Sequence, residues 1–217
     1  TAGGLHPLRA VYTTPHHQFP TLVTMSAARR LRLLRWARRH RVAIIEDDYD
    51  HELHFAGQPT RPLMASDDAG VVMYVGSLSK AFAPALRQGF VVGPRPVLDA
   101  VAQLRQIIDR QGDRVGERAM AELLDEGEVH RHLRKMTQLF RHRRQVLLEL
   151  LQQELADDVE VKAARGGMTV WARIRRRPRG RTVQQLVDLA VDEGVRVTAA
   201  SSLHVDQTDM PHLRIGF

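Results

Sequence analysis

Short apolar runs and longer amphipathic stretches alternate along the first half of the chain. Residues 42–46, 71–75 and 88–92 are continuous apolar runs of the kind buried in a parallel sheet, and residues 9–13 form a further short strand. Amphipathic stretches that suit helices lie between these runs. We therefore expect an α/β unit with a largely parallel sheet.

Two helices of this half can be placed by their apolar stripes. The first is capped by Ser26 and repeats Leu31, Leu34 and Ala37 on one side. The second begins near Pro96, because proline suits the first turn of a helix. Its stripe is expected to face inward and consists of Leu98, Val101, Leu104 and Ile108.

The second half of the chain predicts a different arrangement. After a helix near 114–124, a long helix over about 128–155 would span roughly 40 Å, enough to link two domains. Four short strands and one helix follow, at 159–162, 168–174, 182–193, 195–198 and 212–217. This pattern indicates an α+β module. We place the domain boundary near residue 127, with a large domain over 1–127 and a small C-terminal domain over 128–217.

The composition is that of a globular protein with a sizeable core, since 43% of the 217 residues are hydrophobic and 26% are charged. The absence of cysteine excludes disulfides and thiolate catalysis. No apolar run approaches the roughly 20 residues of a membrane span, and no signal peptide is visible, so we expect a cytoplasmic protein.

Because the chain starts at Thr1 without methionine and stops on a predicted strand, we expect a fragment of a longer protein.

The net charge of +7 suggests nucleic-acid binding, because basic residues that neutralise phosphates drive non-specific affinity. The arginines are dispersed, however, over the helix at 26–40, the long helix and the turn at 173–181. Aromatic residues make up only 5% and do not interleave with the arginines as a stacking platform requires. We expect weak, salt-sensitive DNA binding without sequence preference from this chain.

Lys80 is the most informative single residue. In open α/β sheets, ligands bind beyond the carboxyl ends of the strands, and the loops at 14–21, 46–50 and 76–80 would open there. Only three of the 32 basic residues are lysine, and Lys80 follows two serines and precedes a nearly uncharged stretch. We expect partial desolvation, which would free its amine as a nucleophile, a role that arginine cannot take. The alternative is an ordinary surface lysine.

The acidic run after the 42–46 strand has two functional interpretations besides a solvated loop. Asp47 and Asp48 could bind Mg²⁺, since hard cations take clustered carboxylates. Alternatively, one carboxylate holds a ring nitrogen protonated, and Tyr49 binds a phenolic oxygen. The histidines nearby, His51 and His54, fit no specific zinc motif, and we predict no metal site.

Two further groups could bind anions. Ser77, Ser79 and Arg87 form a candidate phosphate site of two hydroxyls and one guanidinium. Arg214 lies in a short apolar strand and is a candidate clamp for a substrate carboxylate, or else a surface arginine on an edge strand. The chain has neither a Gly-x4-Gly-Lys nor a Gly-x-Gly-x-x-Gly motif, which argues against nucleotide hydrolysis and dinucleotide binding.

Four motifs, in this order, resemble the aminotransferase-like module of the MocR-type regulators in the GntR superfamily. They are Thr14-Pro-x-His-Gln-Phe-Pro-Thr21, Ile45-Glu-Asp-Asp-Tyr-Asp50, Tyr74-Val-Gly-Ser-Leu-Ser-Lys80 and Pro84-Ala-Leu-Arg-Gln-Gly89. The resemblance covers nearly the whole chain. It implies a fold-type-I, pyridoxal-phosphate (PLP)-dependent fold, here part of the large parallel-sheet domain plus the smaller C-terminal domain. Members of that group also carry an N-terminal winged-helix DNA-binding domain, which this chain lacks.

The resemblance also assigns roles to individual residues. Lys80 matches the lysine that forms a Schiff base with PLP, and Asp47 matches the acid that keeps the pyridine nitrogen protonated. Tyr49 matches the tyrosine that hydrogen-bonds the 3′-oxygen. The phosphate would be held by Ser77, Ser79 and Arg87. Arg214 matches the arginine that receives the carboxylate of an amino-acid ligand.

Two positions depart from the aminotransferase pattern. Phe19 stands where classical aminotransferases have the asparagine that contacts the 3′-oxygen, and MocR-like sequences commonly have an aromatic residue there. Leu22 replaces a glycine that is usual in both groups, so this loop is expected to take another path.

The resemblance implies a homodimeric effector domain that binds an amino compound on PLP as an external aldimine. That event would shift the attached DNA-binding domain, which alone would bind DNA specifically. The alternative is a working aminotransferase, which needs the same residues and proton transfer by Lys80. Phe19 and the Asp-Asp-Tyr run favour the regulator. A Mg²⁺-dependent phosphotransferase that uses Asp47 and Asp48 is a third, remote class.

Overall fold

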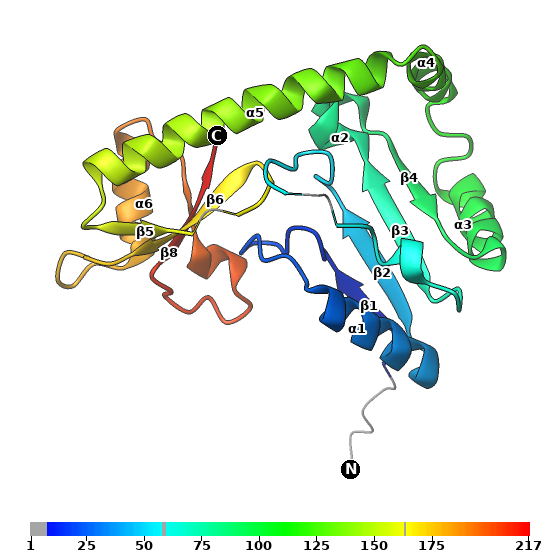
Figure 1. Cartoon of the computed structure of the whole chain (residues 1–217), viewed down its shortest axis with the longest axis horizontal. Helices are drawn as coiled ribbons and strands as arrows, with labels where there is room; N and C mark the ends of the chain where they lie inside the picture. The colour runs from blue at the N-terminus through cyan, green and yellow to red at the C-terminus, as the bar shows by residue number, and fades with distance from the viewer. Residues whose placement is uncertain (1–7, 58–59, 163) are drawn as a thin grey trace. The chain divides into compact units, whose positions relative to one another are not determined.

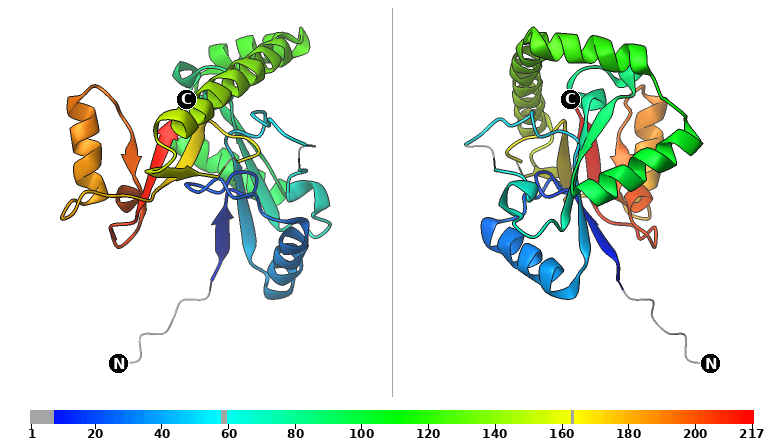
Figure 2. Two further views of the ribbon diagram at one scale, coloured as in Figure 1. Left: turned by 60° about the vertical axis from the view of Figure 1, so that its left-hand side comes forward. Right: turned by 90° about the vertical axis from the view of Figure 1, so that its right-hand side faces the viewer.

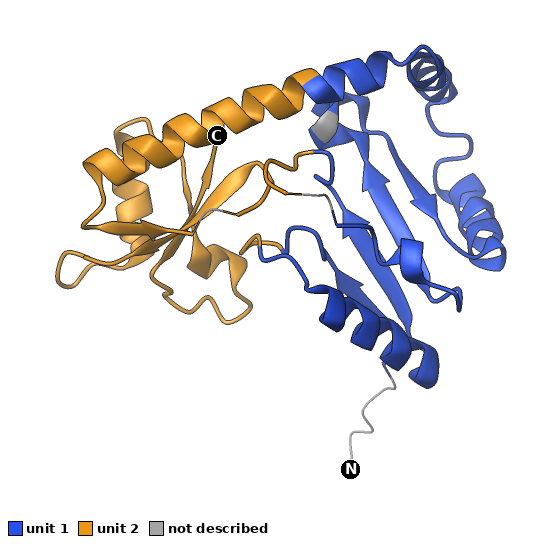
Figure 3. Ribbon diagram, in the orientation of Figure 1, with its two compact units in different colours: residues 1–18, 23–52, 58–134 blue, residues 19–22, 53–57, 135–217 orange. Residues whose placement is uncertain are grey.

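The computed structural model describes residues 8–57, 60–162 and 164–217, and the chain forms two compact units (Figure 1, Figure 3). Unit 1 comprises Thr1–Gln18, Val23–Glu52 and Gln58–Arg134, and unit 2 comprises Phe19–Leu22, Leu53–Gly57 and Lys135–Phe217. The change from one unit to the other falls inside the long helix at Arg134, whereas the sequence analysis placed the domain boundary near residue 127.

Unit 1 is built on a four-stranded sheet. Its strands are β1 (Ala10–Thr13), β2 (Ala43–Asp48), β3 (Val72–Ser77) and β4 (Gly89–Val92), in that spatial order. The first three strands are parallel, and β4 pairs antiparallel with β3. The predicted strands and the largely parallel sheet are confirmed. The parallel pairing brings the carboxyl ends of β1, β2 and β3 to one edge of the sheet.

One face of this sheet is covered by α1 (Ala27–His40), as Figure 2 shows. Leu34 and Ala37 of the helix pack with Ile44 of β2 and Val72 of β3 in the core of the unit. Burial of each larger side chain contributes roughly 1.5–3 kcal/mol. Ser26 is the N-cap residue as predicted, but its side chain makes no capping hydrogen bond.

The three longer remaining helices of unit 1 follow the predicted order, and a short helix and two 3₁₀ turns that were not predicted lie between the strands. They are α2 (Leu78–Ala81), α3 (Arg95–Ile108), α4 (Arg114–Asp125) and the start of α5 (Glu128–Glu154), with 3₁₀ turns η1 (Met64–Ser66) and η2 (Pro84–Leu86). The expected inward stripe of α3 is wrong: Leu104 is 58% exposed and Ile108 is 81% exposed. The helical period is right, but within the described part of the chain no element packs over that stripe.

Unit 2 contains an antiparallel sheet and one covering helix, as the α+β prediction implies. The strand order is β5 (Val159–Val161), β6 (Thr169–Ile174), β8 (His212–Gly216) and β7 (Thr198–Ala199). The 3₁₀ turn η3 (Ala200–Leu203) follows β7. Helix α6 (Val183–Asp192) begins at a capping box between Thr182 and Gln185 and packs Val183 and Val187 into the core. Among the described helices, none is long and apolar enough to cross a membrane.

Candidate functional site

The register of the parallel strands places two of the predicted site residues on one face of the unit 1 sheet. Asp47 in β2 pairs with Val75 in β3, and Ser77 lies two residues beyond Val75. Because side chains alternate along a strand, Asp47, Val75 and Ser77 share a face. This is the face opposite α1, since Ile44 of β2 packs against that helix. Asp47 and Ser77 therefore meet at the carboxyl edge, where ligands bind in open α/β sheets.

Asp47 and Asp48 have different surroundings. Asp47 is partly exposed and accepts a hydrogen bond from the hydroxyl of Tyr12 in β1. Burial of that hydroxyl and its contact with Asp47 raise the pKa of Tyr12 to about 12. Asp48 is 4% exposed on the other face and accepts a hydrogen bond from Tyr74 at 2.9 Å. Two carboxylates on opposite faces cannot chelate one ion, so the Mg²⁺ interpretation of this pair is wrong.

Burial and a neighbouring histidine shift the pKa of Asp48 in opposite directions. Burial alone would raise its pKa, but contact with His16 outweighs this and holds the pKa of Asp48 below its ordinary value. Burial likewise opposes a charge on His16, whereas Asp48 raises the pKa of His16 above its ordinary value. A negative carboxylate beside a positively charged imidazole is the arrangement that these directions favour.

Tyr49 is anchored on the loop that follows β1. Its hydroxyl donates a hydrogen bond to the backbone carbonyl of His17 at 3.0 Å. His17 is itself held by Asp50, with 2.7 Å between Nδ1 and Oδ1, and both side chains are buried. The two loops are thus tied together on either side of Tyr49, and a buried His17–Asp50 hydrogen bond helps to hold its phenol ring in position.

Lys80 lies in the short helix α2, directly after β3. Ser77 caps this helix, because its Oγ accepts a hydrogen bond from the backbone N–H of Ser79 at 3.2 Å. Ser79 is buried, whereas Lys80 is exposed. The desolvation expected from the apolar residues that follow Lys80 is therefore wrong for this structure. The amine is instead accessible at the same edge of the sheet as Ser77.

Arg87 reaches this edge through the turn between α2 and β4. It adopts φ 48°, in the left-handed region, and its side chain is exposed with no ion pair among the described residues. The strands on either side approach closely: a Cβ at Gly89 would lie 2.6 Å from the carbonyl oxygen of Gly76. Glycine is needed there for this contact. The paired strands bring the turn that carries Arg87 back beside Ser77, the partner of Gly89.

Arg214 belongs to unit 2, where it lies in β8 opposite Trp171 of β6. Its guanidinium carbon lies 5.2 Å from the centre of the Phe19 ring, a cation–π contact. Its Nε is buried and has no hydrogen-bond partner among the residues described. A buried, unsatisfied donor of this kind suits an anionic ligand better than an edge-strand surface position.

Leu22 keeps the backbone conformation that glycine would favour. Its φ is 62°, and its side chain is only 5% exposed. A leucine in the left-handed region carries roughly 1–2 kcal/mol of strain, which burial of its side chain offsets. This backbone conformation is one that a glycine adopts readily, and the different path expected for the loop stays a prediction.

The residues of unit 1 fit PLP in their chemistry. Asp47 offers a carboxylate on the open face of the sheet, Lys80 offers an accessible amine, and Arg87 offers a guanidinium with no ion pair in the described part of the chain. Ser77 and Ser79 add hydroxyls beside it. An acid for a ring nitrogen, an amine for an aldehyde and a cation for a phosphate are the groups that this cofactor requires.

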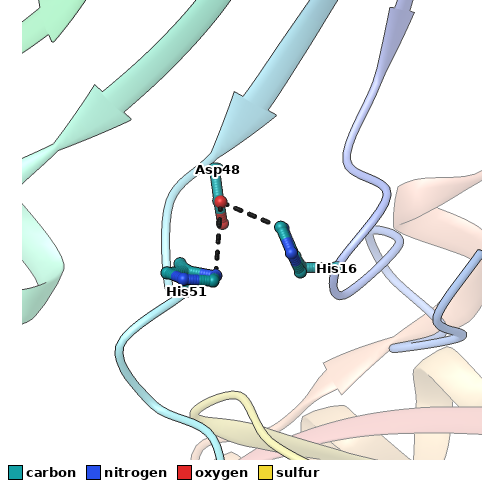
Figure 4. A group of neighbouring side chains, drawn as sticks. All are labelled: His16, Asp48 and His51. Atoms are coloured by element: carbon teal, nitrogen blue, oxygen red, sulfur yellow. Dashed lines mark ion pairs between the residues drawn. The ribbon is translucent and has the colours of Figure 1, made fainter. Parts of the chain in front are cut away.

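Sequence reasoning assigned no role to three residues near this edge, and it considered His51 only as a metal ligand and rejected it. Tyr12 contacts Asp47, and His16 and His51 both approach Asp48 (Figure 4). The position of His16 shortly after β1 could have indicated that it lies near Asp48, because the carboxyl ends of neighbouring parallel strands lie at the same edge of the sheet. Tyr12 carried no such signal, since it reads as an ordinary strand residue.

Comparison with known proteins agrees with this picture. The family model described as aminotransferase class I and II matches residues 13–217. An uncharacterized HTH-type transcriptional regulator of Bacillus subtilis, YhdI, is 32% identical over 95% of this chain and 44% of its own length. The probable rhizopine catabolism regulatory protein MocR of Rhizobium meliloti is 34% identical over 77% of this chain and 34% of its own length. The chain thus spans less than half the length of these relatives.

Solved structures give the same fold. The crystal structure of kynurenine aminotransferase from Pyrococcus horikoshii, in complex with PMP, superimposes with a TM-score of 0.87 and 27% sequence identity. The match covers 96% of this chain and 51% of that protein. The predicted fold-type-I aminotransferase architecture is confirmed.

Proposed function

The chain belongs to the class I and II aminotransferase family, and we propose that it is the PLP-binding effector part of a MocR-type transcriptional regulator. The observation that carries the proposal is the edge of the unit 1 sheet, where Asp47 and Ser77 share the open face and Lys80 follows with an exposed amine. Similarity to HTH-type regulators over most of the chain supports the regulatory role.

Each residue of unit 1 has a defined task in this proposal. Lys80 would attach the cofactor covalently, and Asp47 would hold a proton at the pyridine nitrogen. Tyr49, anchored on the carbonyl of His17, would fix the 3′-oxygen of the ring. The phosphate would be bound by Ser77, Ser79 and Arg87. When bound, PLP supplies an electron sink for the amino compound attached to it.

Arg214 would recognise the ligand rather than the cofactor. A guanidinium binds a carboxylate through two parallel N–H···O bonds, which favours amino compounds that carry an acid group. The buried Nε of Arg214 is then satisfied by the ligand. Removal of the Arg214 side chain would weaken binding of the amino compound more than it weakens binding of PLP.

The effect on DNA would be indirect. Binding of the amino compound would favour one conformation of the protein, and the attached winged-helix domain would respond through a population shift. We further propose that the protein acts as a homodimer in the cytoplasm. A ligand can shift such an equilibrium only by its difference in affinity for the two conformations.

An absorbance experiment tests cofactor attachment. The protein that carries this chain is incubated with PLP, and we expect a visible band that borohydride removes. Lys80→Ala should abolish the band, and the matched control Lys162→Ala, which alters another exposed lysine, should keep it. A band that survives in Lys80→Ala would contradict the assignment.

A catalytic aminotransferase is the second candidate, favoured by the match to kynurenine aminotransferase. That function requires the same residues and, in addition, proton transfer by the amine of Lys80. The two candidates differ in turnover. With a second 2-oxo acid supplied as the amino acceptor, conversion of an amino acid to its 2-oxo acid at many equivalents per protein chain would support the enzyme. Binding of the amino acid without such conversion would support the regulator.

A further inference from the structure

His16, Asp48 and His51 gather at the carboxyl ends of two neighbouring parallel strands. His16 lies in the loop after β1, Asp48 is the last residue of β2, and His51 follows three residues later. Figure 4 shows the two imidazole rings on either side of the Asp48 carboxylate. This cluster faces the α1 side of the sheet, away from Asp47, and no role in the proposed cofactor site involves it.

The three side chains are close enough to share one ion. One ligand atom from each lies within 4.8 Å of the other two. Nδ1 of His16 is 2.9 Å from Oδ2 of Asp48, and Nδ1 of His51 is 3.6 Å from the same oxygen. Nitrogen and oxygen ligands about 2.1 Å from a tetrahedral metal ion lie roughly 3.4 Å apart. The observed spacing is close to this value.

The orientation of His16 calls for a cation between the ring and the carboxylate. Nε2 of His16 lies 2.5 Å from the backbone carbonyl of Thr60, which can only accept, so Nε2 carries the hydrogen. In a neutral ring, Nδ1 then directs a lone pair toward Asp48. Metal-binding histidines commonly donate their other N–H to a backbone carbonyl in this way, which fixes the tautomer.

Asp48 is prepared in a similar manner. Its side chain is 1% exposed, and Oδ1 has no hydrogen-bond partner among the described residues. Tyr74 donates to Oδ2 and holds the carboxylate in place. A buried carboxylate oxygen without a hydrogen bond lowers the stability of the fold. A metal ion bound by this carboxylate would compensate for that loss of stability.

His51 distinguishes a metal ion from a single proton. A proton on His16 could satisfy the His16–Asp48 pair alone, but 3.6 Å is too long for a hydrogen bond from His51. Protonation of both rings would place two positive charges at a ring separation of 4.6 Å. One divalent ion satisfies both neutral rings and the carboxylate together.

We propose that His16, Asp48 and His51 form a binding site for a divalent transition-metal ion of the zinc class. Two imidazoles and one carboxylate are a donor set that such ions prefer over Mg²⁺ or Ca²⁺. The side chain of His51 is 32% exposed, which leaves the ion accessible on that side. Three protein ligands leave a fourth position for water.

Calorimetric titration of Zn²⁺ into the chelator-treated, purified protein tests this site, and Co²⁺ provides a visible spectrum of the bound ion. We expect one ion per chain at this site. His51→Ala should weaken Zn²⁺ binding at least about 10-fold, and it alters a side chain that is only partly buried. The matched control His40→Ala, at the exposed end of α1, should leave binding unchanged.

A second variant guards against non-specific histidine binding. Asp48→Asn keeps the shape of the side chain and removes its charge, so the Co²⁺ spectrum should be lost while the circular dichroism of the fold persists. If His51→Ala binds Zn²⁺ as tightly as the unaltered protein, or if His40→Ala loses as much affinity, the proposal is overturned. Absence of Zn²⁺ binding by the unaltered protein would also overturn it, and would leave a protonated His16–Asp48 pair.

Discussion

Asp47 and Asp48 are adjacent in β2, yet their carboxylates lie on opposite faces of the unit 1 sheet. Asp48 is buried among Tyr74, His16 and His51, whereas Asp47 lies on the open face beside Tyr12. The alternation of a strand thus separates two chemically identical groups into a structural carboxylate and an accessible one.

This separation predicts different outcomes for two isosteric substitutions. Asp47→Asn should weaken PLP binding and change the free energy of unfolding by less than about 0.5 kcal/mol. Asp48→Asn should destabilise the protein by about 1–3 kcal/mol, because a buried, hydrogen-bonded carboxylate is lost. Urea unfolding and PLP titration of both variants measure the two effects. A larger loss of PLP affinity in Asp48→Asn would reverse our assignment.

Arg30 is a buried arginine that ties three segments of unit 1 together. Its guanidinium donates to the carbonyl oxygens of Met25, Arg61 and Pro15 at 2.8–2.9 Å. Arg30→Ala should therefore destabilise the protein by about 3 kcal/mol, since it leaves these carbonyls without their donor. The exposed neighbour Arg32 is the control, and Arg32→Ala should change stability by less than about 0.5 kcal/mol. Equal effects in urea unfolding would contradict this account of Arg30.

His212 predicts a dependence of stability on pH in unit 2. Burial and the nearby charge of Arg173 lower the pKa of His212 below its ordinary value of 6.5, against a smaller opposing effect of Glu160. The unfolded chain therefore binds the proton more readily than the folded chain. Its contribution to stability is complete above about pH 6.5 and is lost as the pH falls below that value.

Replacement of His212 by glutamine removes this titration. Between pH 7 and pH 5, His212→Gln should lose less stability than the unaltered protein in denaturant unfolding. The exposed His204 provides the control, and His204→Gln should follow the unaltered protein. Parallel pH profiles of stability for all three proteins would show that His212 does not cause the loss of stability between pH 7 and pH 5.

The basic charge of the chain predicts only non-specific DNA binding. Arg29, Arg32, Arg35 and Arg39 are exposed on α1, away from the Leu34 and Ala37 side that packs on the sheet. A solvated face of this kind attracts phosphates without reading bases. In gel-shift titrations this chain should bind specific and scrambled duplexes equally, and binding should fall steeply with salt. Sequence-selective binding at physiological salt would contradict the prediction.

The sequence predicted the strands and helices well because each is encoded locally. Apolar runs and helical stripes placed the elements within a few residues, and the carboxyl-edge rule singled out the loops that carry Asp47 and Lys80. The exposure of Lys80 and of the α3 stripe could not be predicted in this way. Burial depends on which distant segment covers a side chain, and residues nearby in the chain do not determine that.

Tertiary pairing also explains what was missed around the acidic run. Glu46 ends the strand predicted at 42–46, but nothing in the sequence predicts its partners: it is fully buried and accepts hydrogen bonds from the backbone N–H groups of Leu63 and Met64. The cluster of His16, Asp48 and His51 forms because β1 and β2 pair in parallel at one register. That register cannot be predicted from the spacing of the histidines along the sequence.

The attachment point of PLP is the most direct test of the proposed function. The protein that carries this chain is loaded with PLP, reduced with borohydride and digested, and the modified peptide is identified by mass spectrometry. We predict a phosphopyridoxyl group on Lys80 and none on Lys135 or Lys162. Modification of either other lysine in place of Lys80, or none at all, would contradict the proposal that this chain binds PLP at Lys80.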